Sequence, residues 1–148
     1  PTQLRKMTLT TIVIDDSTLQ RVATGRLIEN HPNLRLMGTF DDPKKGLEAV
    51  NKFQPDVLFL DIEMPGLGGF EVLELLECDC QVILNSTRSQ FALHAFQYDQ
   101  VKDFLVKPMN KPRFEKSVDK AIKNMSVEKV SRLDMGQHVW MKRLSKAS

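Results

Sequence analysis

Short apolar segments alternate along this chain with longer segments of helical periodicity. The clearest apolar segment, residues 57–60, holds Val, Leu, Phe and Leu in succession and runs directly into Asp61. A segment this short, with no alternating polar positions, is typical of a strand buried on both faces. Pro65 and three nearby glycines predict a loop immediately afterwards. Asp61 is therefore expected at the carboxyl end of a central strand, where open parallel sheets bind their ligands.

Four further segments predict strands around this one. Residues 11–14, 82–84 and 104–106 are short and apolar, whereas residues 34–39 alternate loosely, as an edge strand does. Helical segments separate the strands, so the chain alternates strand and helix from beginning to end. This alternation predicts an α/β fold: a doubly wound, five-stranded parallel sheet with helices on both faces.

Five helices are predicted from caps and apolar spacing. Ser17 caps the first helix, and Asp42 with Pro43 starts the second. A third helix is predicted over residues 70–77 and a fourth over residues 90–97. Apolar residues recur at helical spacing in the first helix (Leu19, Val22, Ala23, Leu27), on the inner face of the second (Leu47, Val50), and most clearly in the last (Phe114, Val118, Ala121, Ile122, Met125).

Charge divides the chain into two parts. The net charge of +2 combines a mildly acidic body with residues 127–148, which carry +3. We therefore expect one domain over residues 8–126, followed by a basic linker over 127–148, and the acidic body is not expected to bind nucleic acid.

No apolar run is long enough to span a bilayer, and no signal peptide is visible, so a cytoplasmic protein without a membrane partner is expected. Cys78 and Cys80 have no further Cys and no His nearby that could complete a metal site, so we interpret them as ordinary thiols.

Polar residues follow four of the predicted strands. Asp15 and Asp16 follow the first, Asp61 the third, Ser86 the fourth and Lys107 the fifth. The carboxyl ends of parallel strands share one edge of the sheet, so three carboxylates, a hydroxyl and an ammonium are expected together. Three carboxylates need a counter-charge, and Mg²⁺ with oxygen ligands is the common cation beside phosphate. A carboxylate held there is a competent nucleophile toward phosphorus, with the ammonium and hydroxyl neutralising phosphoryl oxygens.

With these motifs in order, the sequence resembles a receiver domain of a two-component response regulator. The matching residues are Asp15-Asp16, the run from Asp61 to Pro65, Ser86, and Lys107-Pro108, and the resemblance covers roughly residues 8–125. It implies a flavodoxin-like sheet with strand order 2-1-3-4-5 and a cis bond between Lys107 and Pro108.

The resemblance also implies a role for each residue. Asp61 would be the phosphoacceptor, Ser86 the switch hydroxyl, Lys107 the phosphate-binding lysine and Phe104 the switch aromatic. The metal ligands implied are Asp15, Asp16, Asp61 and the backbone carbonyl of Glu63. The chain would then be a signalling switch and not a dedicated enzyme.

Details of the sequence suggest a subfamily and an output. The run after Asp61 and residues 89–96 resemble receivers coupled to LytTR-type DNA-binding domains, and residues 137–142 resemble the first strand of such a domain. The implied partners are a sensor histidine kinase, a second copy of the chain on phosphorylation, and DNA only through an output domain beyond Ser148. Thr87 stands where Ala or Gly is usual in receivers, and a narrower entrance to Asp61 is the expected consequence.

Two other classes remain as alternatives. A hydrolase that forms a phosphoaspartate favours Asp-x-Asp after the first strand and inserts a cap domain, whereas here the nucleophile follows the third strand and no cap is present. A flavodoxin-like binding module would need a phosphate loop rich in hydroxyls and glycines after the first strand, where this chain has Asp15 and Asp16.

Overall fold

A computed structural model describes residues 8–125 as a single parallel sheet covered by helices. The spatial order of the strands is β2-β1-β3-β4-β5, and every neighbouring pair is parallel. Both the α/β class and this strand order confirm the prediction. The strands are β1 (Leu9–Ile14), β2 (Leu34–Phe40), β3 (Val57–Asp61), β4 (Gln81–Ser86) and β5 (Val101–Val106).

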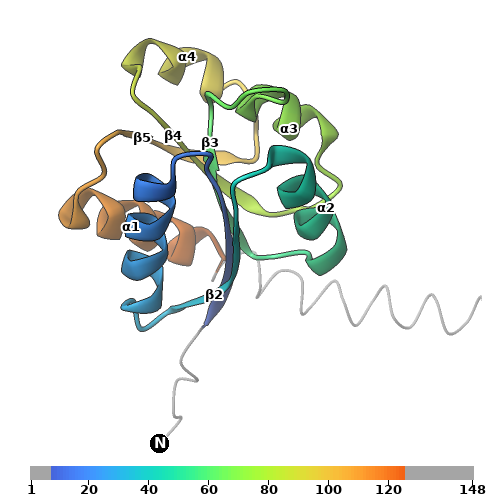
Figure 1. Ribbon diagram of the computed structural model, residues 1–148. Coiled ribbons are helices and arrows are strands. Elements are labelled where there is room, and N and C mark those ends of the chain that lie inside the picture. The colour runs from blue at the N-terminus through green and yellow to red at the C-terminus, as the bar shows by residue number, and fades with distance from the viewer. Residues whose placement is uncertain (1–7, 126–148) are drawn as a thin grey trace, which may run out of the picture.

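The helices form a layer on each face of the sheet (Figure 1). The helix α1 and a last helix over residues 111–125 cover one face, and α2 and α3 cover the other. Their bounds are α1 (Thr18–Glu29), α2 (Pro43–Phe53), α3 (Gly69–Leu75), a 3-10 turn η1 (Ser89–Phe91) and α4 (Ala92–Ala95).

Alternation along the strands divides the core into two clusters. Phe59 and Ile83 face α1 and the last helix, together with Phe114 and Val118 of that helix. Leu58, Leu60, Val82 and Leu84 face α2, α3 and α4. Successive strand residues point to opposite faces, so these two sets fix the side of the sheet on which each residue within a strand lies.

Local signals set the helix starts as predicted. The Ser17 hydroxyl accepts a hydrogen bond from the Gln20 amide, and the Asp42 carboxylate accepts one from the Lys44 amide. These bonds satisfy amides that have no partner inside the helix. The last helix also agrees with its pattern, since Phe114, Val118, Ala121 and Met125 are all buried.

The buried face of the first helix differs from the face that its apolar spacing predicts. Thr24, Gly25 and Ile28 are the buried residues of α1, whereas Leu19 is 78% exposed and Val22 44%. The helix carries apolar residues on more than one side, so the pattern alone does not select the packed face. Gly25 packs against β2, and a Cβ there would make ordinary van der Waals contacts with the side chains of Leu36 and Thr39.

The third helix is shorter than the 70–77 predicted. It ends at Leu75 because side chains of α2 bind the polypeptide there. Asn51 accepts a hydrogen bond from the Glu77 amide at 2.8 Å and donates to the Leu75 carbonyl at 3.4 Å, and Gln54 donates to the Glu77 carbonyl. These tertiary contacts replace the bonds that two more helical residues would make.

The fourth helix also differs from the 90–97 predicted, since α4 proper spans only four residues after η1. A turn follows, in which the Tyr98 amide donates to the Ala95 carbonyl. The Tyr98 ring stacks on Phe70, and its hydroxyl donates to Glu74 at 2.9 Å. Contacts to α3 thus end the helix early.

Part of the sequence interpretation lies outside the described residues. The basic linker over 127–148 and the resemblance of residues 137–142 to an output domain both fall there and stay predictions. Among residues 8–125, no helix is both long enough and apolar enough to cross a membrane.

Candidate functional site

Three predicted site residues lie on one face at the carboxyl edge of the sheet. Val13, Phe59 and Leu105 point toward the face covered by α1 and the last helix. Two residues further along each strand, Asp15, Asp61 and Lys107 therefore lie on that same face. The fold brings together from β1, β3 and the end of β5 residues that are far apart in sequence.

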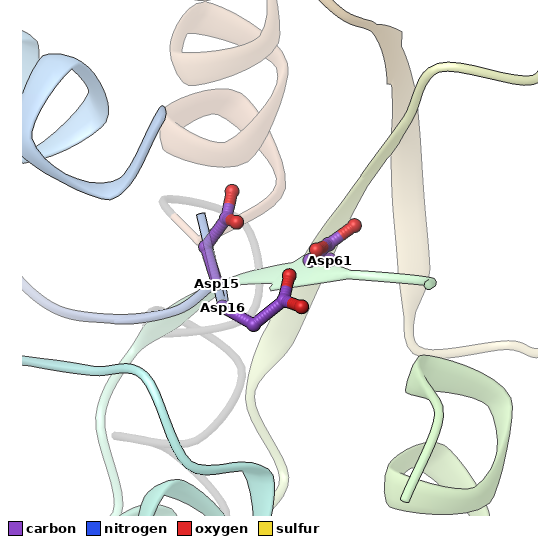
Figure 2. Close-up of side chains that lie close together, drawn as sticks. All are labelled: Asp15, Asp16 and Asp61. Carbon is purple, nitrogen blue, oxygen red and sulfur yellow. The ribbon is translucent and has the colours of Figure 1, made fainter. Parts of the chain in front are cut away.

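The carboxylates of Asp15, Asp16 and Asp61 gather at this edge, as Figure 2 shows. One oxygen from each residue lies within 4.8 Å of the other two. Asp15 and Asp61 are buried, and Asp16 is exposed. Hard carboxylate oxygens at this separation are the donor set that Mg²⁺ prefers. The residues therefore fit the predicted magnesium ion, which Asp15, Asp16 and Asp61 would hold.

Crowding of negative charge alters the titration of Asp61. Burial raises the pKa of this carboxyl most strongly, and the neighbouring Asp15 charge raises it further. The Lys107 ammonium lowers it only in part, and the resulting pKa is about 7, against an ordinary 3.8. Because so little positive charge compensates the ionised Asp61, a bound divalent cation would stabilise it.

Lys107 bridges two of the three carboxylates. Its ammonium lies 3.1 Å from Asp15 and 3.3 Å from Asp61, and its side chain is only 9% exposed. The Lys107 amide donates to the Ser86 carbonyl at 2.8 Å, and the bond to Pro108 is cis, as predicted. A buried ammonium at this position can meet a phosphoryl group attached to Asp61.

The loop after β3 lies close to Asp61. The Glu63 amide donates to the Asp61 carboxylate at 3.3 Å. The chain then returns at Gly69, where a Cβ would stand 2.5 Å from the Asp61 carbonyl oxygen. Only glycine permits so close an approach, and the Gly69 amide donates to the Ile62 carbonyl at 2.8 Å.

Ser86 ends β4 one residue beyond Asn85, which pairs with Asp61. The Ser86 side chain is buried, and its hydroxyl accepts a hydrogen bond from the Arg88 amide at 3.0 Å. Thr87 is exposed. The hydroxyl therefore lies at the edge where the resemblance places it.

The Phe104 ring is 7% exposed and lies in the core cluster that includes Ala95 and Val101. The Phe104 side chain thus points into the core. It faces the opposite side of the sheet from Asp61, next to α4.

A second ionic cluster was not predicted from the sequence. Asp103 of β5 is buried, and both of its carboxylate oxygens accept hydrogen bonds from the Arg113 guanidinium, at 2.7 and 2.8 Å. Ser117 donates to the same carboxylate, and the Lys120 ammonium lies 3.5 Å away. Burial alone would raise the pKa of Asp103, but Arg113, Ser117 and the Phe104 amide outweigh it and lower the pKa to about 2. The spacing of Asp103 and Arg113 gives no local signal, since they meet only when the last helix packs on β5.

These features define an α/β domain with a carboxylate and lysine site at the carboxyl edge of a parallel sheet. Residues 11–119 match the family described as the response regulator receiver domain, and the chain belongs to that family. Receiver domains are the phosphorylation switches of two-component systems; they interact with sensor histidine kinases and generally bind Mg²⁺ at an acidic pocket. They are signalling proteins and not dedicated enzymes.

Individual proteins agree with this assignment. The chain is 32% identical over 117 residues to a response regulatory protein of Vibrio cholerae, covering 78% of this chain and 49% of that protein. It is 29% identical over 128 residues to the transcriptional regulatory protein BtsR of Escherichia coli, covering 85% of this chain and 53% of BtsR. The chain thus spans about half the length of these relatives.

Among solved structures, the signal receiver domain of the response regulator NarL from Mycobacterium tuberculosis is similar at a TM-score of 0.68 and 29% identity. The match covers 78% of this chain and 97% of that domain.

Proposed function

We propose that this chain is a switch that a sensor histidine kinase activates by phosphorylating Asp61. The observation that carries the proposal is the buried Asp61 carboxylate, 3.3 Å from the Lys107 ammonium and grouped with Asp15 and Asp16. An oxygen of Asp61 attacks the phosphorus of a phosphohistidine, the P–N bond breaks, and the imidazole nitrogen recovers a proton. The product is an acyl phosphate on Asp61.

Each side chain has a part in that transfer. The magnesium ion, when bound, supplies positive charge that neutralises the carboxylates and the incoming phosphoryl oxygens. Asp15 and Asp16 hold the ion with Asp61, and the Glu63 carbonyl is a further ligand in this proposal. Lys107 neutralises a phosphoryl oxygen, and the Ser86 hydroxyl turns from the Arg88 amide to donate to another.

The exposed side of α1 supports a protein partner beside the site. Leu19 is 78% exposed in the first turn of α1, three residues after Asp16, and Val22 follows one turn later. Exposed apolar side chains grouped beside a site favour protein docking. The kinase domain carrying the phosphohistidine is the partner we propose for this surface.

The output surface in this proposal comprises α4, β5 and the last helix. Three apolar side chains are exposed there: Leu93 of α4 is 85% exposed, Phe96 at its C-cap 53%, and Val106 at the end of β5 48%. Phosphorylation stabilises the inward position of Phe104 and a form of this surface that pairs with a second copy. The relative BtsR is a transcriptional regulator, and transcription through an output domain of LytTR type beyond Ser148 is the proposed readout.

Acetyl phosphate with Mg²⁺ tests the phosphorylation directly. Intact-mass spectrometry is expected to find one added phosphate, dependent on Mg²⁺ and absent from Asp61→Asn. Full labelling of Asp61→Asn would refute the assignment of the phosphoacceptor. Release of many equivalents of inorganic phosphate per protein would instead identify the rival class, a hydrolase that passes through a phosphoaspartate.

A further inference from the structure

Asn85 shares the row of side chains that forms the site. It pairs directly with Asp61 in the parallel register of β3 and β4. Ile83, two residues earlier, faces α1 and the last helix, so Asn85 faces that side as well. The strand registers therefore give the row Asp15, Asp61, Asn85 and Leu105 across β1, β3, β4 and β5, and Lys107 follows two residues beyond Leu105 on the same face.

Lys107 can reach the carboxylates only by crossing β4. It follows β5, whereas its ammonium lies within 3.3 Å of Asp61 on β3 and within 3.1 Å of Asp15 beyond β1. Neighbouring strands are about 4.8 Å apart, so the side chains of Lys107 and Asp61 must extend toward one another to meet across the position of β4. Asn85 is the residue of β4 that pairs with Asp61 on that face, so it lies between Asp61 and the strand from which Lys107 comes.

The Asn85 side chain carries an oxygen with no donor. Asn85 is 1% exposed, and its Oδ1 finds no hydrogen-bond partner within the described part of the chain. A buried amide oxygen without a donor is costly, so it calls for an explanation. An ammonium has three N–H donors, and that of Lys107 lies 3.3 Å from the carboxylate of Asp61, the residue that pairs with Asn85.

We propose that Asn85 is a positioning residue for Lys107 in the phosphorylated protein, an inference that rests on the proposed phosphorylation of Asp61. Phosphorylation converts a charged oxygen of Asp61 into the ester oxygen of an acyl phosphate, which is a weak acceptor. The ammonium then turns from Asp61 to a phosphoryl oxygen, and Asn85 Oδ1 accepts one of its other N–H groups. The oxygen that lacks a donor before phosphorylation gains one afterwards, which favours the phosphorylated form.

Gln81 provides a matched control on the same strand and face. It is 3% exposed, and its Oε1 also lacks a donor among residues 8–125, but its amide nitrogen donates to the Ala121 carbonyl of the last helix at 2.9 Å. Gln81 lies at the amino end of β4, four residues from Asn85 and away from the row. Replacing it removes a comparable buried amide without touching Lys107.

The test compares Asn85→Leu, Asn85→Asp and Gln81→Leu with the wild type. Asn85→Leu has nearly the same shape without an acceptor, and Asn85→Asp keeps the Oδ1 acceptor. We expect labelling by acetyl phosphate to be about tenfold slower in Asn85→Leu, as for the loss of a hydrogen bond to a charged group. Gln81→Leu should label at the wild-type rate.

A spectroscopic measurement separates positioning from a general structural effect. In protein labelled with ¹³C at the lysine ε-carbon, beryllofluoride with Mg²⁺ should shift the Lys107 signal in the wild type and in Asn85→Asp. Asn85→Leu should lose most of that shift while melting at the same temperature as the wild type or higher, since a polar atom without a partner has been removed.

Two results would have different meanings. A wild-type protein that takes up no phosphate would refute the proposed function itself. A wild type that is labelled normally, with Asn85→Leu equal to it in labelling rate and Lys107 shift, would overturn only the role of Asn85.

Discussion

The Arg88 guanidinium lies 3.2 Å from the Glu63 carboxylate (Nε to Oε1), which joins the loop after β3 to the loop after β4. Glu63 is two residues beyond Asp61, and Arg88 two beyond Ser86. Both side chains are more than 40% exposed, so the pair lies at the surface beside the buried carboxylate.

We predict that this pair slows loss of the phosphate. An exposed ion pair contributes only about 0.2–1 kcal/mol to stability, so its removal should leave the fold intact. It would nevertheless obstruct water approaching the phosphorus in line, with Thr87 exposed beside it. The double variant Glu63→Ala with Arg88→Ala should lose phosphate several-fold faster, as measured by mass spectrometry over time. An unchanged half-life would mean that the pair does not restrict water.

The pKa of Asp61 predicts an effect of pH on stability. Burial and Asp15 raise that pKa from 3.8 to about 7, so the folded protein keeps a proton that the unfolded chain has lost. Without Mg²⁺, stability should therefore fall as pH rises from about 4 through about 7. Asp61→Asn has no such proton and should melt higher than the wild type at pH 8, with a smaller difference at pH 5. Equal differences at both pH values, by calorimetry, would contradict the raised pKa.

Magnesium should reverse that loss. Mg²⁺ needs Asp61 ionised, so its affinity should rise with pH through about 7, and added Mg²⁺ should raise the melting temperature more at pH 8 than at pH 6. Asp16→Asn removes one ligand of the cluster and should abolish most of the stabilisation. Stabilisation of Asp16→Asn equal to that of the wild type, with the same Mg²⁺ concentration, would exclude Asp16 as a ligand.

The Asp103 cluster should stabilise the packing of the last helix on β5. Asp103→Asn leaves Arg113 without its carboxylate, and since the Arg113 side chain is 36% exposed, we expect a loss of about 2 kcal/mol in the free energy of unfolding, as for hydrogen bonds to a charged group. Because the folded pKa of Asp103 is lowered to about 2, this stabilisation is present above pH 4 and is lost as pH falls toward 2. Urea unfolding at pH 7 and pH 3 measures both effects.

Lys120 offers the control for that measurement. Its ammonium is 3.5 Å from Asp103 with the side chain 48% exposed, so Lys120→Ala should cost well under about 1 kcal/mol. Similar losses for Lys120→Ala and Asp103→Asn would show that the buried pair with Arg113 has no special weight.

Dimerisation through α4 and β5 can be tested with two phenylalanines of equal exposure. Phe96, the C-cap residue of α4, and Phe53, the last residue of α2, are each 53% exposed. Beryllofluoride with Mg²⁺ should strengthen wild-type dimerisation in analytical ultracentrifugation, Phe96→Ser should weaken the dimer at least tenfold, and Phe53→Ser should not. Identical monomer–dimer constants with and without beryllofluoride would refute phosphorylation-dependent pairing on this surface.

Much of the fold and the main residues of the site follow from the sequence alone. The apolar run into Asp61 predicts β3 and its carboxyl end, and Ser17 and Asp42 predict the starts of α1 and α2, because these are local effects of burial and capping. The order of strand and helix predicts the parallel sheet. A parallel sheet in turn predicts that Asp15, Asp61 and Lys107 meet, since the carboxyl ends of its strands share one edge.

Tertiary packing decided what local patterns leave open. Side chains of α2 end α3 at Leu75, and the packing of α1 against β2 buries Gly25 while Leu19 stays exposed. Asp103 meets Arg113 only after the last helix has docked, and Asn85 joins the site only through its register with Asp61. In each case the deciding contact joins residues on different elements, so its free energy depends on their arrangement in space and has no signature in the neighbouring sequence.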